Sequence, residues 1–409
     1  MAGLGRTFSD LSRYKRDFAR LVKKAQDRAP APAQAPSRVP SRLAEVADFG
    51  PNPGNLRMLA YVPPTLRPKP ALVVVLHGCG QTAAAYDHGT GWSALADEHG
   101  FALVFPEQQK ANNPQGCFNW FEGGDIRRDE GEARSIRAMV ERMAADHGVD
   151  RARVFVTGLS AGGAMAGAML AAYPEVFAGG AIVAGLPYGT ALNVQEAFES
   201  MFKGRVRLAS EWGDLVRGAS GHDGPWPRVS IWHGSADATV VPANAVETVK
   251  QWADVHGLSA AATVESRGPG FTRQVWRDKA GREVIESFTI AGMAHGAPLA
   301  AGAGEGRYGN AGPFLLDVGV SSTFHIANFW GLAGERVAAT ESVAVIAPDG
   351  AITLPSKVKG PTPKAEPAAH AYAAPEHEER ANRDEDAGGL GGQINAVITK
   401  ALRAAGLMR

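Results

Sequence analysis

The amino-acid sequence predicts a three-layer α/β fold with a mostly parallel central sheet, flanked by extensions at both ends of a 409-residue chain. Between residues 55 and 332, short apolar runs rich in β-branched residues follow one another, and helical patterns separate them. Strands that are apolar on both faces and alternate with helices are typical of a parallel sheet covered by helices on both sides. With 45% hydrophobic and 21% charged residues, most of the chain can bury a core, which excludes wholesale disorder.

The first segment, residues 1–28, is expected to form an amphipathic helix. Its apolar residues recur at steps of three and four, and the remaining positions carry eight Lys or Arg against three Asp, a local charge of +5. Such a helix either packs on its own domain or docks on a hydrophobic or anionic surface, and the sequence leaves both interpretations open. Residues 29–45 follow as a linker rich in proline and alanine.

The central domain is predicted to span residues 46–335. Its expected strands are the apolar runs at 58–62, 72–76, 102–105, 154–157, 181–184, 229–232 and 284–290. Helical spacing of apolar residues occurs between them at 92–98, 131–147, 161–173 and 243–256.

The alternating pattern fails after the central domain. Residues 336–390 are rich in proline, alanine and acidic residues, so this tail is expected to be largely disordered. Residues 391–409 again show helical spacing, which fits either a second docking helix or a frayed chain end.

Composition also restricts the class of protein. The chain has 42 Lys and Arg against 42 Asp and Glu, so it lacks the positive field of a nucleic-acid-binding protein. No run approaches the roughly 20 apolar residues of a transmembrane helix. Charges interrupt the apolar residues of the N-terminus, which removes the pattern of a secretory signal and favours a cytoplasmic protein. Two cysteines, Cys79 and Cys117, allow one disulfide at most.

The main chemical motif is the pentapeptide Gly158-Leu159-Ser160-Ala161-Gly162, which matches G-x-S-x-G. An apolar strand precedes it and an alanine-rich helix follows it. A serine at such a sharp turn needs glycines on both sides, and its hydroxyl then stands exposed above a helix N-terminus. The alternative, a glycine-rich turn with a capping serine, is disfavoured by this strand and helix context.

A nucleophilic serine needs a base and an acid, which in this architecture follow it in the order acid, then histidine. Asp237 comes just after the strand at 229–232, and His295 lies between glycines in a loop after the strand at 284–290. Asp214 and Asp223 compete for the acid's role. Among the other histidines, those at 77 and 233 are interpreted as packing or loop-shaping residues.

An oxyanion hole needs two convergent backbone N–H groups. Ala161 follows the nucleophile and is expected to supply one of them. Cys79 lies between glycines in the loop after the strand at 72–76 and is expected to supply the other. An ordinary glycine-rich loop is the alternative at this second position. Trp120 and Phe121 are candidate walls for an apolar substrate, or else ordinary core residues.

Five segments together resemble the polyhydroxybutyrate depolymerase family of α/β-hydrolase esterases, which is also similar to fungal feruloyl and acetylxylan esterases. They read LHGCGQ (76–81), CFNWF (117–121), GLSAGGAM (158–165), IWHGSADATV (231–240) and GMAHG (292–296). The resemblance covers roughly residues 52–332.

The resemblance implies that Ser160 is the nucleophile, with Asp237 and His295 as its partners. It implies an ester of a short-chain hydroxyacid as the substrate, and we expect poly(3-hydroxybutyrate) or its oligomers. It also implies a disulfide between Cys79 and Cys117. It places residues 1–28 where a substrate-binding domain is missing, so a polyester granule surface is a candidate partner. Members of the family are usually secreted, which makes an extracellular or periplasmic location the alternative to the cytoplasm.

Three other functions remain open at this point. A serine peptidase of the prolyl oligopeptidase type is disfavoured because the chain has no room for a propeller domain. A feruloyl or acetylxylan esterase shares every motif, and a non-enzymatic granule-binding protein would not need an intact catalytic set. No metal or organic cofactor is expected, because the sequence contains no H-E-x-x-H, C-x-x-C or dinucleotide-binding motif.

Overall fold

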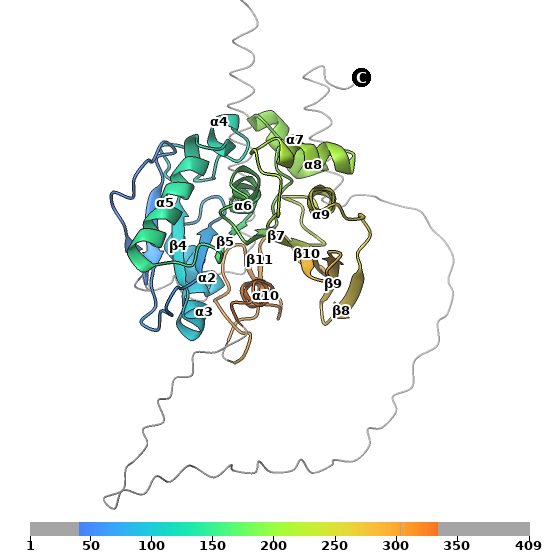
Figure 1. The fold of residues 1–409 in the computed structure, drawn as a ribbon. Coiled ribbons are helices and arrows are strands. Elements are labelled where there is room, and N and C mark those ends of the chain that lie inside the picture. The colour runs from blue at the N-terminus through green and yellow to red at the C-terminus, as the bar shows by residue number, and fades with distance from the viewer. Residues whose placement is uncertain (1–40, 303, 334–409) are drawn as a thin grey trace, which may run out of the picture. The chain divides into compact units, whose positions relative to one another are not determined.

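The computed structural model describes residues 41–302 and 304–333 (Figure 1). The predictions for residues 1–28, 336–390 and 391–409, and for most of the linker at 29–45, lie outside the described residues. Within these residues a ten-stranded sheet has the strand order β1-β2-β4-β3-β5-β6-β7-β10-β9-β8. The strands from β4 to β10 in this order all run parallel, whereas the outer strands at both edges pair antiparallel. The prediction of a mostly parallel sheet is therefore confirmed.

The strand bounds, in chain order, are β1 (Ala44–Glu45), β2 (Arg57–Tyr61), β3 (Leu72–Leu76), β4 (Ala102–Glu107), β5 (Val154–Leu159), β6 (Gly179–Val183), β7 (Arg228–Gly234), β8 (Val264–Gly268), β9 (Phe271–Arg277) and β10 (Glu283–Ile290). A separate two-stranded sheet pairs β11 (Ala297–Leu299) with β12 (Leu315–Asp317). The helices are α2 (Ala83–Thr90), α3 (Trp92–His99), α4 (Gly123–Ile126), α5 (Gly131–His147), α6 (Ala161–Ala172), α7 (Val194–Lys203), α8 (Ala209–Arg217), α9 (Ala243–Val255) and α10 (Ser322–Phe329).

Helices cover both faces of the sheet, as alternation along the central strand β3 shows. Leu72, Val74 and Leu76 belong to a core cluster shared with α5, α6 and α9. Val73 and Val75 point to the other face and belong to a cluster shared with α2, α3 and α10. All five side chains are buried, because a parallel strand with helices on both sides has no solvent-facing side.

Several elements differ from the sequence-based expectation. Ala44 and Glu45, placed at the end of the predicted linker, pair with β2 as a two-residue edge strand, too short to produce a pattern. The hairpin of β8 and β9 was not expected, because the residues of β8 are mostly exposed and form no apolar run. Helices α2, α4, α7, α8 and α10 were also not among the four predicted helices.

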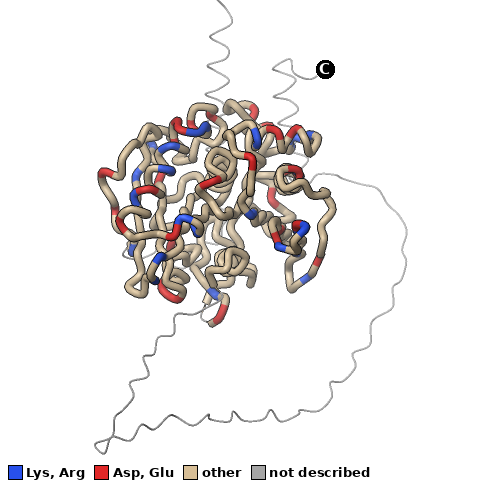
Figure 2. Tube along the Cα trace, in the orientation of Figure 1, with Lys and Arg blue, Asp and Glu red and all other residues tan. Residues whose placement is uncertain are grey.

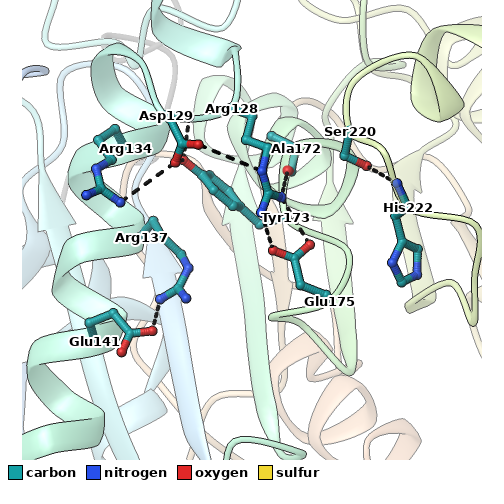
Figure 3. Close-up of polar contacts among 10 residues, drawn as sticks. All are labelled: Arg128, Asp129, Arg134, Arg137, Glu141, Ala172, Tyr173, Glu175, Ser220 and His222. Carbon is teal, nitrogen blue, oxygen red and sulfur yellow. Dashed lines mark hydrogen bonds and ion pairs between the residues drawn. The ribbon is translucent and has the colours of Figure 1, made fainter.

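A polar network fixes the C-terminal end of α6 to the segment before α5 (Figure 3). The Arg128 guanidinium donates to the carbonyl oxygen of Ala172 at 2.8 Å and to the Glu175 carboxylate at 2.7 Å. The Tyr173 hydroxyl accepts a hydrogen bond of 2.7 Å from the backbone N–H of Asp129. Since Ser160 immediately precedes the first turn of α6, these contacts help to hold the helix that follows the turn at Ser160.

Charged residues of both signs are interspersed over the described elements (Figure 2). Within this part of the chain, no helix is long and apolar enough to cross a membrane.

Candidate active site

Ser160 lies at the turn between β5 and α6, with φ 58° and ψ −116°. A residue other than glycine rarely has positive φ, and such strain is concentrated at functional sites. The flanking glycines make the turn possible. A Cβ atom on Gly158 would lie 2.3 Å from the carbonyl carbon of Gly162, and one on Gly162 would lie 2.4 Å from the carbonyl oxygen of Leu76. Both contacts are too close, so the turn requires glycine at each position.

The structure brings Ser160, His295 and Asp237 into one hydrogen-bonded chain. The Nε2 atom of His295 is 2.9 Å from the Oγ atom of Ser160. The Nδ1 atom of the same ring is 2.7 Å from Oδ2 of Asp237. With Nδ1 protonated, the ring donates to Asp237 and presents a free electron pair to the serine hydroxyl, which is the arrangement of a serine, a base and an orienting acid.

Hydrogen bonds join the loop of Asp237 to the loop of His295. The backbone N–H of Ala236 donates to the carbonyl oxygen of Met293 at 3.0 Å, and the N–H of Gly292 donates to the hydroxyl of Ser235 at 2.8 Å. A Cβ atom on Gly234 would lie 2.2 Å from the carbonyl oxygen of Met293, so only glycine permits this approach. These loops follow neighbouring strands, β7 and β10, which explains why residues far apart in the chain meet here.

Asp237 is buried and its carboxylate is fully engaged. Its Oδ1 atom accepts hydrogen bonds of 2.9 Å from the backbone N–H groups of Thr239 and Val240. Burial alone would raise the pKa of Asp237, but the neighbouring His295 and His233 outweigh this effect and hold that pKa well below its usual range. Asp237 is thus a carboxylate suited to stabilise a charged imidazole.

His233 contacts Asp237 in the structure, whereas the sequence suggested only a packing or loop-shaping role. Its Nε2 atom is 2.7 Å from the carbonyl oxygen of Val240 and 3.4 Å from Oδ2 of Asp237. No motif distinguished it from a loop-shaping histidine. The rival acids do not reach His295: Asp214 pairs with Arg217 on α8, and Asp223 is exposed.

The loop after β3 approaches the turn at Ser160 and carries Cys79. The Gly78 N–H donates to Oε1 of Gln81 at 2.9 Å, and the Gly78 carbonyl oxygen lies 2.8 Å from Nδ1 of His77. The Nε2 atom of His77 accepts from the N–H of Gln108 at 3.1 Å, and burial lowers the pKa of this histidine, consistent with a neutral ring. A disulfide joins Cys79 to Cys117, 38 residues away.

A cavity of about 700 Å³ opens beside Ser160. It is lined by Ser160, His295, Cys79 and Ala161, and by the predicted wall residues Trp120 and Phe121. The predicted site residues therefore surround one space, except that Asp237 lies behind His295. Helix α7, which the sequence analysis missed, supplies a further part of the wall. Its signal was present, because apolar residues recur at 194, 197, 198, 201 and 202 after a capping asparagine.

A buried carboxyl group, Glu132, supports the loop that carries Trp120. Its carboxylate accepts a hydrogen bond of 2.9 Å from the N–H of Asn119 and a second one from the side-chain amide of Gln108. That amide also donates to the carbonyl oxygen of Cys117 at 2.9 Å. Burial, reinforced by the charge of Asp125, raises the pKa of Glu132 to about 8. Among residues 41–302 and 304–333, no cluster of His, Cys, Asp and Glu suits a metal ion.

Comparison with known proteins places this site in a family. The family described as Esterase PHB depolymerase matches residues 56–276. The poly(3-hydroxyalkanoate) depolymerase C of Paucimonas lemoignei is 49% identical over 293 residues, covering 71% of this chain and 70% of that protein. An acetylxylan esterase of Coprinopsis cinerea is 36% identical over 264 residues, covering 63% of this chain and 70% of that protein.

A solved structure supports the same assignment. The acetyl xylan esterase from Aspergillus awamori superimposes with a TM-score of 0.58 and 29% identity, covering 62% of this chain and 93% of that one. The resemblance drawn from the five sequence motifs is confirmed: the chain belongs to the PHB depolymerase family of esterases.

Proposed function

We propose that the protein is a serine esterase that hydrolyses esters of short-chain hydroxyacids, with poly(3-hydroxybutyrate) or its oligomers as the substrate. The hydrogen-bonded chain of Ser160, His295 and Asp237 at the wall of an apolar cavity carries this proposal. The 49% identity to a protein named as a poly(3-hydroxyalkanoate) depolymerase supports the substrate class.

The geometry supports acyl transfer in two steps. His295 takes the hydroxyl proton of Ser160 as Oγ attacks the ester carbonyl carbon, and the N–H groups of Cys79 and Ala161 stabilise the oxyanion. The carbon–oxygen bond to the alcohol then breaks, and His295 returns its proton to the departing oxygen. Water attacks the acyl-enzyme with His295 again as the base, which releases the acid and restores Ser160. Asp237 stays ionised and stabilises the imidazolium in both steps.

The apolar part of the cavity supports a polyester substrate. Trp120, Phe121 and the aromatic residues of α7 give it apolar walls. Asn113 and Asn119 also line the cavity, but their side-chain amides are engaged within the protein. Asn113 donates to the side-chain oxygen of Asn119 at 2.9 Å, and Asn119 donates to the carboxylate of Asp125 at 3.1 Å. Sugar hydroxyl groups need hydrogen-bond partners when they are buried, whereas a polyester offers carbonyl acceptors and apolar carbon.

A feruloyl- or acetylxylan-type esterase is the second candidate function. The 36% identity to an acetylxylan esterase and the similarity to a solved acetyl xylan esterase favour it. It would use the same serine and the same oxyanion groups, so acyl and alcohol preference alone distinguishes it from the first. A non-enzymatic granule-binding protein accounts for none of the hydrogen bonds between Ser160, His295 and Asp237.

Residues 1–28 are proposed to dock on the polyester surface, on the basis of their apolar spacing and their charge of +5. Deleting them should abolish binding to polymer granules and leave hydrolysis of a dissolved ester intact. Equal loss of both activities would contradict this docking role.

The oxidation state of the two cysteines indicates the compartment in which the protein works. The sequence favoured the cytoplasm, but a disulfide persists in oxidising compartments and is reduced in an ordinary cytosol. The Cys79–Cys117 bond therefore supports the extracellular or periplasmic alternative. Free thiols in protein collected from its native compartment would argue for the cytoplasm instead.

The direct test compares wild type with Ser160→Ala in two assays, the clearing of a suspension of amorphous 3-hydroxybutyrate polymer and the hydrolysis of p-nitrophenyl butyrate. We expect wild type to perform both reactions and the variant to perform neither. Hydrolysis of the dissolved ester alone would keep the mechanism and leave a soluble oligomer or a carbohydrate-linked acyl group as the substrate. Failure of wild type in both assays would overturn the enzymatic proposal.

A further inference from the structure

Helix α7 presents one continuous apolar face to the cavity. Val194, Ala197, Phe198, Met201 and Phe202 all line the cavity, and they are spaced as i, i+3, i+4, i+7 and i+8. This spacing places them on one side of the helix. The rings of Phe198 and Phe202 stack, with centroids 6.0 Å apart and planes inclined by 8°.

Polar contacts hold α7 firmly in this position. The buried hydroxyl of Ser200 donates to the carbonyl oxygen of Thr190 at 3.1 Å, and the carbonyl oxygen of Ser200 accepts from the side chain of Asn244 at 2.9 Å. The N–H of Val241 donates to the carbonyl oxygen of Met201 at 2.8 Å. These contacts join α7 to the loop before it, to the loop after β7 and to the first turn of α9, so α7 is anchored as a wall of the cavity.

An adjoining part of the wall comes from a distant part of the chain. Trp120 and Phe121 pack edge to face, with ring centroids 5.4 Å apart, in the loop that the disulfide joins to Cys79. Trp120 shares a buried cluster with Ala197 and Met201 of α7 and with Ala161 beside the nucleophile. Helix α4, which follows this loop, lies at the same end of the fold as α7 (Figure 1).

The cavity is larger than a single acyl group requires. Cavities of about 300 to 1,000 Å³ bury drug-sized ligands, so about 700 Å³ leaves room beyond one four-carbon hydroxyacyl unit. The space that remains next to α7 is apolar. Binding energy gained there, away from the reacting carbonyl, accelerates only those substrates long enough to reach it.

We propose that the face of α7 formed by Val194, Ala197, Phe198, Met201 and Phe202 is a binding subsite for polyester units beyond the scissile ester. This subsite sets the preference for extended chains of hydroxyacyl units over small esters. The inference rests on the proposed polyester hydrolase function. It adds the residues that make the rate depend on the length of the substrate chain.

The experiment measures kcat/KM for 3-hydroxybutyrate oligomers from dimer to hexamer, and for p-nitrophenyl acetate, in wild type and in Phe198→Ala/Phe202→Ala. We expect wild-type kcat/KM to rise with oligomer length. The double variant should lose at least about tenfold on the hexamer, equivalent to about 1.4 kcal/mol, and less than about twofold on p-nitrophenyl acetate. Leu208→Ala is the matched control, because this apolar side chain just before α8 is 68% exposed and does not line the cavity.

A second variant guards against loss of the fold. Phe198→Leu/Phe202→Leu keeps an apolar surface and should retain part of the preference for long oligomers, with an unfolding midpoint close to that of wild type. Equal losses on the hexamer and on p-nitrophenyl acetate, no loss on either, or wild-type rates independent of length would overturn the subsite. If wild type cleaves p-nitrophenyl acetate but none of the oligomers, the proposed function itself fails, and this result appears before any variant is measured.

Discussion

The pH dependence of stability gives a sharp test of the buried carboxyl group of Glu132. This side chain has no solvent exposure and supports the loop that forms one wall of the cavity. Burial raises its pKa to about 8 from an ordinary value of 4.5. The folded protein therefore holds a proton on Glu132 at pH values where the unfolded chain has already released it.

The sign of the effect follows from this difference in proton binding. Below pH 4.5 both states are protonated and the contribution to stability is fully present. Between pH 4.5 and pH 8 the free energy of unfolding should fall by about 1.4 kcal/mol per pH unit, or about 5 kcal/mol in total. Burial lowers the pKa of His256 to about 4, which makes stability rise with pH up to about 6.5 and partly masks this fall in wild type.

Comparison with Glu132→Gln isolates the carboxyl group. The amide does not titrate, and any fixed cost of the substitution shifts its whole profile without changing the slope. The contribution of His256 is common to both proteins and cancels in the difference. Urea unfolding at pH 5.5 and pH 7.5 should show that wild type loses about 2.7 kcal/mol relative to the variant over this interval.

Glu130→Gln serves as the control, since this nearby carboxylate has a side chain that is 53% exposed. Its profile should run parallel to that of wild type. Parallel profiles for wild type and Glu132→Gln would refute the reasoning, because they would mean that Glu132 is ionised in both states over the whole interval.

Two further predictions concern the oxyanion loop and the acid. Replacing Cys79 and Cys117 together by serine opens a closed loop of 38 residues and should lower the free energy of unfolding by about 4 kcal/mol, measured by urea unfolding under non-reducing conditions. An unchanged midpoint would show that the bond is absent in the wild-type protein. His233→Phe keeps a ring of similar size but removes the contact with Asp237, and should lower kcat about tenfold with little change in KM. Unchanged kcat would show that the two backbone N–H donors and His295 suffice to hold the carboxylate.

The sequence was most informative where the chain turns at the end of a parallel strand. Ser160, Asp237 and His295 follow β5, β7 and β10, and the carboxyl ends of parallel strands meet at one edge of the sheet. Strand order and approximate position were therefore enough to bring these residues together in a prediction. The assignment of their catalytic roles stays a prediction until Ser160→Ala is measured.

Features that depend on contacts between distant segments were not predictable in the same way. His233 looks like any histidine at the end of a strand, and only the return of the chain through Val240 places its ring against Asp237. The exposed strand β8 forms by pairing with β9 rather than by burying apolar residues, so it leaves no hydrophobic period. Helix α7 did carry an amphipathic pattern, but its apolar face lines the cavity. The sequence of α7 alone does not show which other segments complete that cavity.

One loop connects the chemistry of this site to its specificity. Cys117 is bonded to Cys79, whose N–H is assigned to the oxyanion, and three residues later Trp120 forms part of the wall for the substrate. Glu132 holds the backbone between them at Asn119. A shift of this loop would displace an oxyanion donor and a substrate contact together. Substitutions that loosen it should therefore change kcat and KM at the same time, whereas truncation of the α7 face should affect only substrates long enough to reach it.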